Sequence, residues 1–360
     1  MDRRQYLVLA SALAAASALP GVAWGAQQQP RFDDIAPSFP DFNGVLLAGV
    51  GSRVDYCAAF GIADAEAGIA MSTSTRFETG SVSKWIAAMT VMKLVDLGKL
   101  SLDEPILRYL PHYRADTGNQ VTLRHLMSHS SGIPNDIIAA RNANAAVKTE
   151  ELGQWEAVQR YASGNLRFKP GAGWDYSHSN WLIVKAIVEQ ASGMAYSQCV
   201  AQYFTIPLKL SGSGMFSGES NKVPGMAVAY ASNTQPRARK ISPLPDYMTM
   251  TGGFFTTASD LLVLMDAVLS GDILSPTARL ALMQVNMPEQ HYALGGRTRV
   301  AMIAGKEREA AWEDGSNGGF RLVARRVLAD GHTVIVMNNT SFDYQMMGRI
   351  GDQLIDRSYV

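Results

Sequence analysis

Apolar positions follow a helical period in some stretches of the chain and an extended period in others. After Gly80, one face of a helix predicted to run to Leu97 carries Trp85, Ala88, Met89, Met92 and Val95. Gly98 then supplies a stop signal for this helix. Similar spacings predict helices at 123–127 behind the N-cap candidate Thr122, around 181–191, around 261–268, and at 344–355.

Short apolar runs near both ends of the chain predict strands. Residues 44–50 and 54–60 are typical of a hairpin closed around Gly51 and Ser52, and residues 320–327 and 333–337 flank the turn signal Asp330-Gly331. Between about 106 and 245 the pattern favours short helices and loops, and hence a mostly helical lobe. The sequence therefore predicts an α+β fold in which hairpins from both ends form one antiparallel sheet.

The first 25 residues have the features of a signal peptide. Arg3 and Arg4 precede an apolar run at 6–19, and small residues at 23–25 favour cleavage near Ala26. The arginine pair also fits a twin-arginine signal, and an uncleaved anchor is the alternative. We expect a signal peptide at 1–25, a polar linker at 26–41 and one domain at 42–360. The protein is then exported to the periplasm or secreted.

Composition narrows the class of partner. The 360 residues are 47% hydrophobic, and 32 Lys plus Arg balance 32 Asp plus Glu. No basic run points to nucleic acid, and no apolar segment after the N-terminus is long enough to span a bilayer. A small molecule or peptide is the expected partner, and the oligomeric state stays open. Cys57 and Cys199 can form a disulfide or remain free thiols.

The start of the predicted helix at Gly80 carries candidate chemistry. Ser81 and Lys84 are one helical turn apart and share a face. If burial keeps the lysine amine partly neutral, it can take the Ser81 proton as the hydroxyl attacks a carbonyl. The alternative is that Ser81 only caps the helix.

Six landmarks along the chain, taken in order, resemble the serine beta-lactamase-related and penicillin-binding superfamily, with class C beta-lactamases, DD-carboxypeptidases and esterases among its members. They are residues 77–84, 97–105, 122–134, 170–171 before 176–177, 252–254 before 260–261, and 315–320. The resemblance spans about Phe42 to the C-terminus. It implies a beta-lactamase/transpeptidase-like α/β (α+β) fold, an antiparallel sheet flanked by helices plus a helical lobe, and a serine hydrolase without metal or other cofactor.

The resemblance also assigns roles at matching positions. Ser81 matches the acylated serine, Lys84 its partner amine, and Tyr176 a tyrosine that relays protons. The backbone N–H groups of Ser81 and Ser316 match the oxyanion hole. A nearby lysine ammonium is expected to lower the pKa of Tyr176 and make it a better base.

Two positions depart from the family pattern. His178 stands where Asn is expected, with Asn180 two residues further on, and Glu313 stands where Lys or His is expected. His178 is expected to hydrogen-bond Lys84 or a substrate amide, and together with Glu313, Gly315 and Ser316 it forms the expected substrate-binding set. Because Glu313 would repel a substrate carboxylate, we expect a neutral or cationic ester, amide or peptide rather than efficient beta-lactam turnover.

Several alternatives remain open from the sequence. The Glu313 alignment is open to a local error, in which case Trp312 or Arg297 reaches the same wall. Arg297 could then substitute as the binder of a substrate carboxylate, but a solvated surface Arg297 is the favoured interpretation. His129 is expected in a structural turn. An impaired penicillin-binding or sensor-like relative, or an acyltransferase, is the alternative to a hydrolase. Acylation of Ser81 separates the enzyme from the binding protein.

Overall fold

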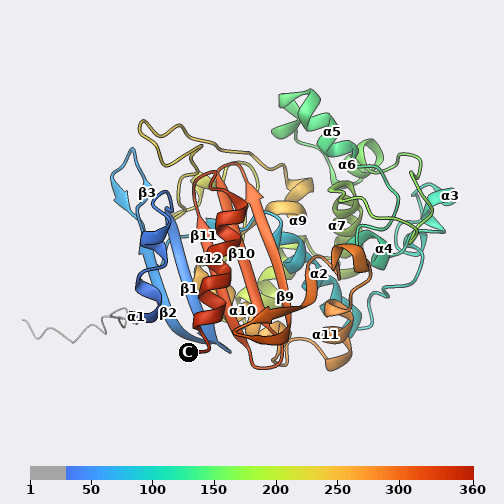
Figure 1. The fold of residues 1–360 in the computed structure, drawn as a ribbon. Coiled ribbons are helices and arrows are strands. Elements are labelled where there is room, and N and C mark those ends of the chain that lie inside the picture. The colour runs from blue at the N-terminus through green and yellow to red at the C-terminus, as the bar shows by residue number, and fades with distance from the viewer. Residues whose placement is uncertain (1–29) are drawn as a thin grey trace, which may run out of the picture.

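The computed structural model describes residues 30–360, and its centre is a six-stranded antiparallel sheet in the order β2-β1-β11-β10-β9-β8 (Figure 1). The strands are β1 (Gly44–Val50), β2 (Arg53–Phe60), β8 (Arg297–Ile303), β9 (Lys306–Asn317), β10 (Phe320–Val327) and β11 (His332–Asn338). β1 pairs with β11 along its whole length, from Gly44 opposite Asn338 to Val50 opposite His332. This confirms the predicted sheet built from both ends of the chain.

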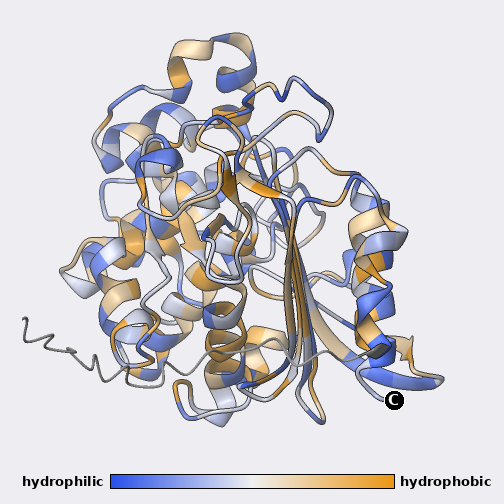
Figure 2. Ribbon diagram, turned by 90° about the vertical axis from the view of Figure 1, so that its left-hand side faces the viewer, coloured by the Kyte–Doolittle hydropathy of each residue, from blue (hydrophilic) through white to orange (hydrophobic). Residues whose placement is uncertain are grey.

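Helices cover both faces of this sheet. α12 (Tyr344–Arg357) lies on one face, and α2 (Val82–Asp96) and α10 (Ala258–Leu269) lie on the other, which Figure 2 shows with the sheet nearly edge-on. Successive residues of β1 alternate between two separate cores: Val45 and Leu47 join the α2 side, while Leu46 and Ala48 join the α12 side. Because both faces are buried, β1 is a continuous apolar run.

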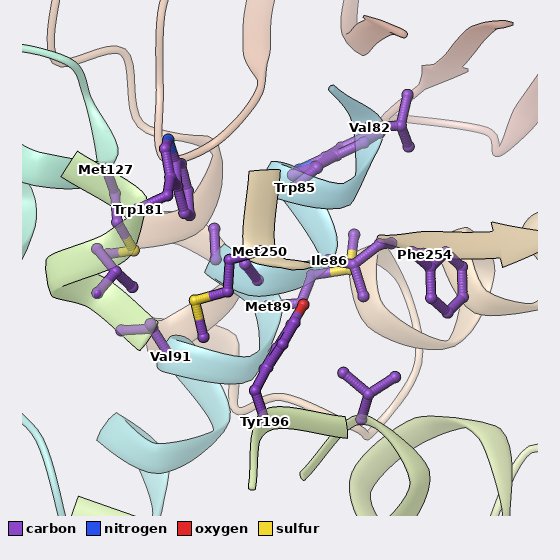
Figure 3. Packing of buried hydrophobic residues seen from close by; sticks show 14 of the residues in the cluster. Val82, Trp85, Ile86, Met89, Val91, Met127, Trp181, Tyr196, Met250 and Phe254 are labelled. Atoms are coloured by element: carbon purple, nitrogen blue, oxygen red, sulfur yellow. The ribbon is translucent and has the colours of Figure 1, made fainter. Parts of the chain in front are cut away.

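α2 is enclosed on all sides rather than along one stripe. Its buried residues include the polar Ser83, Lys84 and Thr90 as well as its apolar ones. It packs against α7 (Ser179–Ser192), α8 (Tyr196–Val200), α9 (Thr249–Gly252) and α11 (Pro276–Met283). Figure 3 shows Trp181, Tyr196 and Met250 from these neighbours around the helix. A helix that is apolar around its circumference is a core helix, and this one starts at Ser81.

The region between β5 and β8 is mostly helical, as the sequence predicted. Its further helices are α3 (Ala115–Gly118), α4 (Leu123–Met127), α5 (Asp136–Ala143) and α6 (Gln154–Tyr161), with a π-helical turn η4 (Ala201–Thr205) and 3-10 turns η2 (Ile106–Arg108), η3 (Ala145–Lys148), η5 (Ser220–Lys222), η6 (Asp246–Met248) and η7 (Pro288–Gln290). Two small sheets accompany them: β3 (Ile62–Asp64) with β4 (Ile69–Ala70), and β5 (Phe77–Glu78), β7 (Phe254–Thr256) and β6 (Gly214–Met215).

Part of the expected linker packs into the fold. α1 (Pro30–Asp33) and η1 (Ala36–Ser38) lie on the α12 side of the sheet, where Phe32 and Ile35 are fully buried. The packed chain therefore begins before Phe42. The expected signal peptide at 1–25 and the start of the linker lie outside the described residues.

Two further observations concern the described part of the chain. Cys57 and Cys199 are both free thiols, so the open question of a disulfide is answered in favour of two thiols. Within residues 30–360, no helix combines the length and the apolar character that a membrane crossing needs.

Candidate active site

Ser81 sits at a tightly held junction between β5 and α2. The Thr79 N–H donates to the Phe254 carbonyl at 3.0 Å, and the Ser83 hydroxyl accepts from the Phe254 N–H at 3.0 Å. Ser81 occupies the N-cap position, yet its side chain makes no capping hydrogen bond. The interpretation of Ser81 as a helix cap is therefore wrong, and its hydroxyl is available for chemistry.

Lys84 points its amine at this hydroxyl from one turn further along α2. Its Nζ lies 3.1 Å from Ser81 Oγ and donates to the Thr251 carbonyl at 2.9 Å. The side chain is fully buried, and burial lowers the pKa of Lys84 to about 7, with Glu313 opposing this and Arg297 adding to it. A large fraction of the amine is therefore neutral at neutral pH, as a general base requires.

Tyr176 approaches Ser81 from the loop before α7. Its hydroxyl donates to Ser81 Oγ at 2.8 Å, and its ring lies 4.3 Å from the His129 ring, centroid to centroid. Burial of the hydroxyl raises the pKa of Tyr176, and the nearby Glu313 carboxylate raises it further. The expected lowered pKa is therefore wrong: loss of solvation outweighs the opposing effects of the Ser81 hydrogen bond and the Arg297 charge, and Tyr176 is a neutral phenol that donates a proton.

The end of β9 runs against the Ser81 turn with no space for side chains. A Cβ on Gly315 would lie 1.9 Å from the Thr79 carbonyl oxygen, and a Cβ on Gly80 would lie 2.3 Å from the Ser316 nitrogen. Gly80 also has φ +51°, which glycine adopts without strain. The two backbone N–H groups assigned to the oxyanion hole, those of Ser81 and Ser316, are thus brought to the same spot.

Glu313 forms an ion pair inside the site wall. Its carboxylate lies 2.7 Å from Arg297 Nη1, and the Glu313 side chain is 2% exposed and that of Arg297 is 22% exposed. Arg297 also lies over the Tyr292 ring, 4.9 Å from its centroid. The favoured interpretation of Arg297 as a solvated surface residue is therefore wrong. Burial raises the pKa of Glu313 while the Arg297 guanidinium opposes this rise.

His178 does not make the hydrogen bond to Lys84 that the sequence suggested. Its Nδ1 is buried without a partner among residues 30–360, and burial together with the Lys84 charge holds the pKa of the imidazole well below its usual range. His178 is therefore neutral, and a cationic imidazole that repels the lysine is not formed. Asn180 has a structural role instead: it accepts from Ser131 and donates to the Leu126 carbonyl.

His129 lies behind the site in the expected turn. Its φ is +61°, and its Nδ1 accepts a hydrogen bond from the Ser177 N–H at 3.0 Å. Through this bond and its contact with the Tyr176 ring, His129 fixes the loop that carries the tyrosine.

Three contacts of the site were not found from the sequence. The Thr251 carbonyl holds Lys84, although Thr251 directly precedes the Gly252-Gly253 landmark and was detectable there. The buried Glu78 carboxylate accepts hydrogen bonds from Asn317 and Ser220 and so ties β5 to the end of β9.

The third contact that was not found from the sequence is the ion pair between Arg297 and Glu313. Arg297 lies opposite Trp312, the neighbour of Glu313, so recognising the β8–β9 turn at Ala304-Gly305 would have brought it near Glu313, although register alone puts it on the face of Trp312.

Two pockets meet at Ser81 and Ser316. The larger, of about 580 Å³, also contains Tyr176, Arg297 and Glu313, with Glu289 and Asp314. The smaller, of about 240 Å³, contains Arg141, Lys148 and His178. In the part of the chain that the structure describes, no group of three or more His, Cys, Asp or Glu side chains is arranged to hold a metal ion.

The chain is similar to a known protein family and to several characterised proteins. The Beta-lactamase family model matches residues 32–353. Esterase EstB from Burkholderia gladioli is 29% identical over 258 residues, 62% of this chain and 64% of the relative, and the putative penicillin-binding protein PbpX from Bacillus subtilis (strain 168) is 26% identical over 65% of this chain and 56% of the relative. The chain thus spans less than two thirds of each of these two curated relatives.

Solved structures share the fold. A penicillin-binding protein from Bacillus halodurans superposes with a TM-score of 0.75 at 23% identity, covering 88% of this chain and 97% of that one. A D-amino acid amidase from Ochrobactrum anthropi SV3 superposes with a TM-score of 0.74 at 19% identity, covering 92% and 97%. The family model covers almost all of the described residues, and the chain belongs to the beta-lactamase family.

Proposed function

We propose that this protein is an exported serine hydrolase that forms an acyl-enzyme on Ser81. The observation that carries the proposal is the position of Ser81 Oγ, 3.1 Å from Lys84 Nζ and 2.8 Å from the Tyr176 hydroxyl. A nucleophile in hydrogen-bond contact with both a base of suitable pKa and a proton donor is the arrangement that acyl transfer requires.

Each residue of the site carries out a separate step of the reaction. Neutral Lys84 takes the proton from Ser81 Oγ as the oxygen attacks the substrate carbonyl, and the N–H groups of Ser81 and Ser316 stabilise the resulting oxyanion. Tyr176 gives its proton to the leaving group and recovers one from the Lys84 ammonium, so the proton taken from Ser81 ends on Tyr176 and both Lys84 and Tyr176 return to their neutral forms. In deacylation the neutral amine accepts a proton from water, hydroxide adds to the acyl carbon, and Ser81 Oγ leaves reprotonated.

The larger pocket determines which leaving groups fit. Tyr176 lines it, so the proton donor faces this side of Ser81. Its charged residues are Glu289, Glu313 and Asp314 against the single cation Arg297. Arg297 is engaged by Glu313, so a carboxylate on the leaving group would meet acidic side chains and no unpaired cation. This supports an ester, amide or peptide with a neutral or cationic leaving group over a beta-lactam that carries a carboxylate there.

The relatives support acyl chemistry without fixing the substrate. Their names include an esterase, a putative penicillin-binding protein and a D-amino acid amidase. Esters and amides are both attacked at a carbonyl, so the same Ser81 geometry serves either.

Intact-protein mass spectrometry tests the proposal. The wild type and Ser81→Ala are each exposed to a fluorophosphonate, a penicillin and a short-chain nitrophenyl ester. A Ser81-dependent adduct together with turnover of the ester supports the hydrolase. A stable adduct without turnover would instead indicate a penicillin-binding or sensor-like protein, and no adduct with any reagent would contradict acylation. Product formed with an added alcohol, faster than hydrolysis, would indicate an acyltransferase.

Export is part of the same proposal and is tested separately. The arginine pair and apolar run at the start of the sequence support it. Full-length protein expressed in a Gram-negative host should be recovered from the periplasm or medium with a new N-terminus near Ala26. Protein found only in the cytoplasm with the first residues intact would contradict export.

A further inference from the structure

The smaller of the two pockets at Ser81 carries positive charge and no acidic residue. Arg141 and Lys148 line it, and none of its lining residues is Asp or Glu. Neither cation has an ion-pair partner among residues 30–360, whereas Arg297 in the larger pocket is paired with Glu313. The cleft is therefore polarised, with unpaired cations on one side of the nucleophile and excess carboxylates on the other.

Arg141 is an unusual cation because it is buried without an anion. Arg141 is 8% exposed. Its guanidinium donates hydrogen bonds to Met248 Sδ at 3.6 Å and to the Pro243 carbonyl at 3.1 Å. A guanidinium has five N–H donors, so several remain free to face the pocket. Buried charges in proteins are normally paired, because desolvation of an isolated charge is costly. An anionic group of a substrate bound in this pocket would gain hydrogen bonds from Arg141 and pair its charge.

Two other polar groups line the same space. His178 contributes a neutral imidazole whose Nδ1 has no hydrogen-bond partner among the described residues. Lys148, at the end of η3, is half-buried and adds a second positive charge. Together these groups offer the donors that a carboxylate accepts.

The position of Tyr176 shows which half of a substrate enters this pocket. Tyr176 lines the larger pocket and is absent from the smaller one, while Ser81 and Ser316 line both. The leaving group must lie beside its proton donor, and so it occupies the larger pocket. The acyl group, on the other side of the carbonyl, then lies in the smaller pocket.

We propose that the pocket formed with Arg141 and Lys148 is an acyl subsite that binds an acyl group ending in a carboxylate, as in half-esters or half-amides of dicarboxylic acids. This inference rests on the proposed hydrolase activity of Ser81. It concerns the acyl side of the substrate and is compatible with the neutral or cationic leaving group already proposed. The two pockets then orient a substrate by charge as well as by shape.

The test compares two substrates of the same shape. Mono-4-nitrophenyl glutarate carries the carboxylate, and its methyl ester carries none. The quantity measured is the ratio of kcat/KM for the acid to kcat/KM for the methyl ester, because this ratio cancels general effects of a substitution on folding. The wild type should favour the acid by roughly 10- to 100-fold, as expected for hydrogen bonds to a charged group. Succinate and adipate half-esters then measure the depth of the subsite.

Variants locate the effect in the pocket. Arg141→Met and Lys148→Met should each lower the ratio at least several-fold, and Arg141→Lys should retain more of it than Arg141→Met. Lys306→Met removes an exposed charge at the distant β8–β9 turn and should leave the ratio unchanged. Higher salt should also reduce the ratio because it screens charge attraction.

The failure of this inference is distinguishable from the failure of the hydrolase. If the wild type hydrolyses both esters with a ratio near one, and Arg141→Met does not change it, the subsite is wrong while the hydrolase stands. If neither ester is hydrolysed, glutarate binding is measured by calorimetry on the wild type, Arg141→Met and Lys148→Met. Binding that both substitutions weaken supports the subsite, and no binding to the wild type overturns it.

Discussion

Lys84 combines a chemical role with a cost in stability. Its amine is enclosed by the protein and held only by hydrogen-bond partners, so the neutral form is favoured. Burial removes the hydration of the ammonium form, which costs stability. The same loss of hydration leaves part of the amine neutral at neutral pH, so that it can accept a proton. Such trade-offs are common where a site needs a shifted pKa.

Replacing this amine should separate the two effects. Lys84→Met is expected to lower kcat/KM by roughly a thousandfold or more, because the base is lost. It should also raise the free energy of unfolding by about 2 to 4 kcal/mol at pH 7, because a buried amine is replaced by an apolar chain of similar length. Ester hydrolysis and chemical denaturation measure the two quantities.

The sign of the pH dependence provides a control. The pKa of Lys84 falls from 10.5 to about 7 on folding, so the unfolded chain binds the extra proton between these values. The stability of the wild type therefore rises with pH across this window, and its deficit relative to Lys84→Met should shrink above pH 7. A variant that is less stable than the wild type at pH 7 would contradict this account.

The same pKa predicts the pH profile of activity. For a neutral ester, kcat/KM should fall about tenfold per pH unit below about pH 7, because protonated Lys84 cannot accept the serine proton. Tyr176→Phe should lower the rate but leave the midpoint of this acid limb in place, since Tyr176 does not contribute to the pKa shift of Lys84. An acid limb near pH 5, in the range of a carboxylate, would assign the base to a different group.

The candidate site could be predicted only in part from sequence. Ser81, Lys84 and Tyr176 do meet within hydrogen-bond distance, because a helix period and a chain of motifs specify residue types and order. The pKa of Tyr176 and the neutrality of His178 were not predictable, since both depend on how far the assembled protein excludes water. Arg141 gave no signal at all: it comes to line the pocket at Ser81 only through the packing of the helical lobe.

α2 is flanked by two glycines, Gly80 before it and Gly98 after it, and each is required for a different reason. Gly80 and Gly98 both have positive φ, at +51° and +69°, but only Gly80 has backbone at the position of a Cβ. Gly80→Ala should push Ser316 away and lower kcat by roughly 100-fold, the effect of losing an oxyanion donor. Gly98→Ala is the matched control, with a cost of about 1 to 2 kcal/mol in unfolding free energy and unchanged kcat.

Steady-state kinetics and denaturation of Gly80→Ala and Gly98→Ala measure the two predicted effects. Equal losses of kcat in both would show that general strain, and not the contact with β9, limits activity. Loss in Gly80→Ala alone would support an oxyanion hole formed where the two backbones touch.

Elements with a clear period were predicted well, and those without one were missed. β1 and β10 have the predicted bounds: β1 is a continuous apolar run, and β10 is bounded by Gly319 and by the turn signal Asp330-Gly331. β8 and β9 escaped detection since their hairpin is rich in Arg, Lys and Glu, and β8 is an edge strand with Val300 and Met302 exposed. Edge strands are commonly charged, which hides the alternation that marks a half-buried strand.

The segment before β1 should contribute measurably to stability. Phe32 is fully buried and its ring lies 4.9 Å from that of Tyr56, centroid to centroid. A chain that begins at Phe42 should therefore unfold at lower temperature than one that begins at Pro30. Phe32→Ala in the longer chain should account for much of the difference, about 3 to 5 kcal/mol. Equal unfolding temperatures for the two chains would show that this segment packs without stabilising.

The pairing of β1 with β11 sets the order of events during synthesis. Gly44 meets Asn338, so the central strand pair waits until nearly all of the chain has left the ribosome. Ser81 is made early, but the strand that brings the Ser316 N–H beside it arrives more than two hundred residues later. A nascent chain therefore carries an unassembled nucleophile, and reactivity appears only once synthesis is nearly finished.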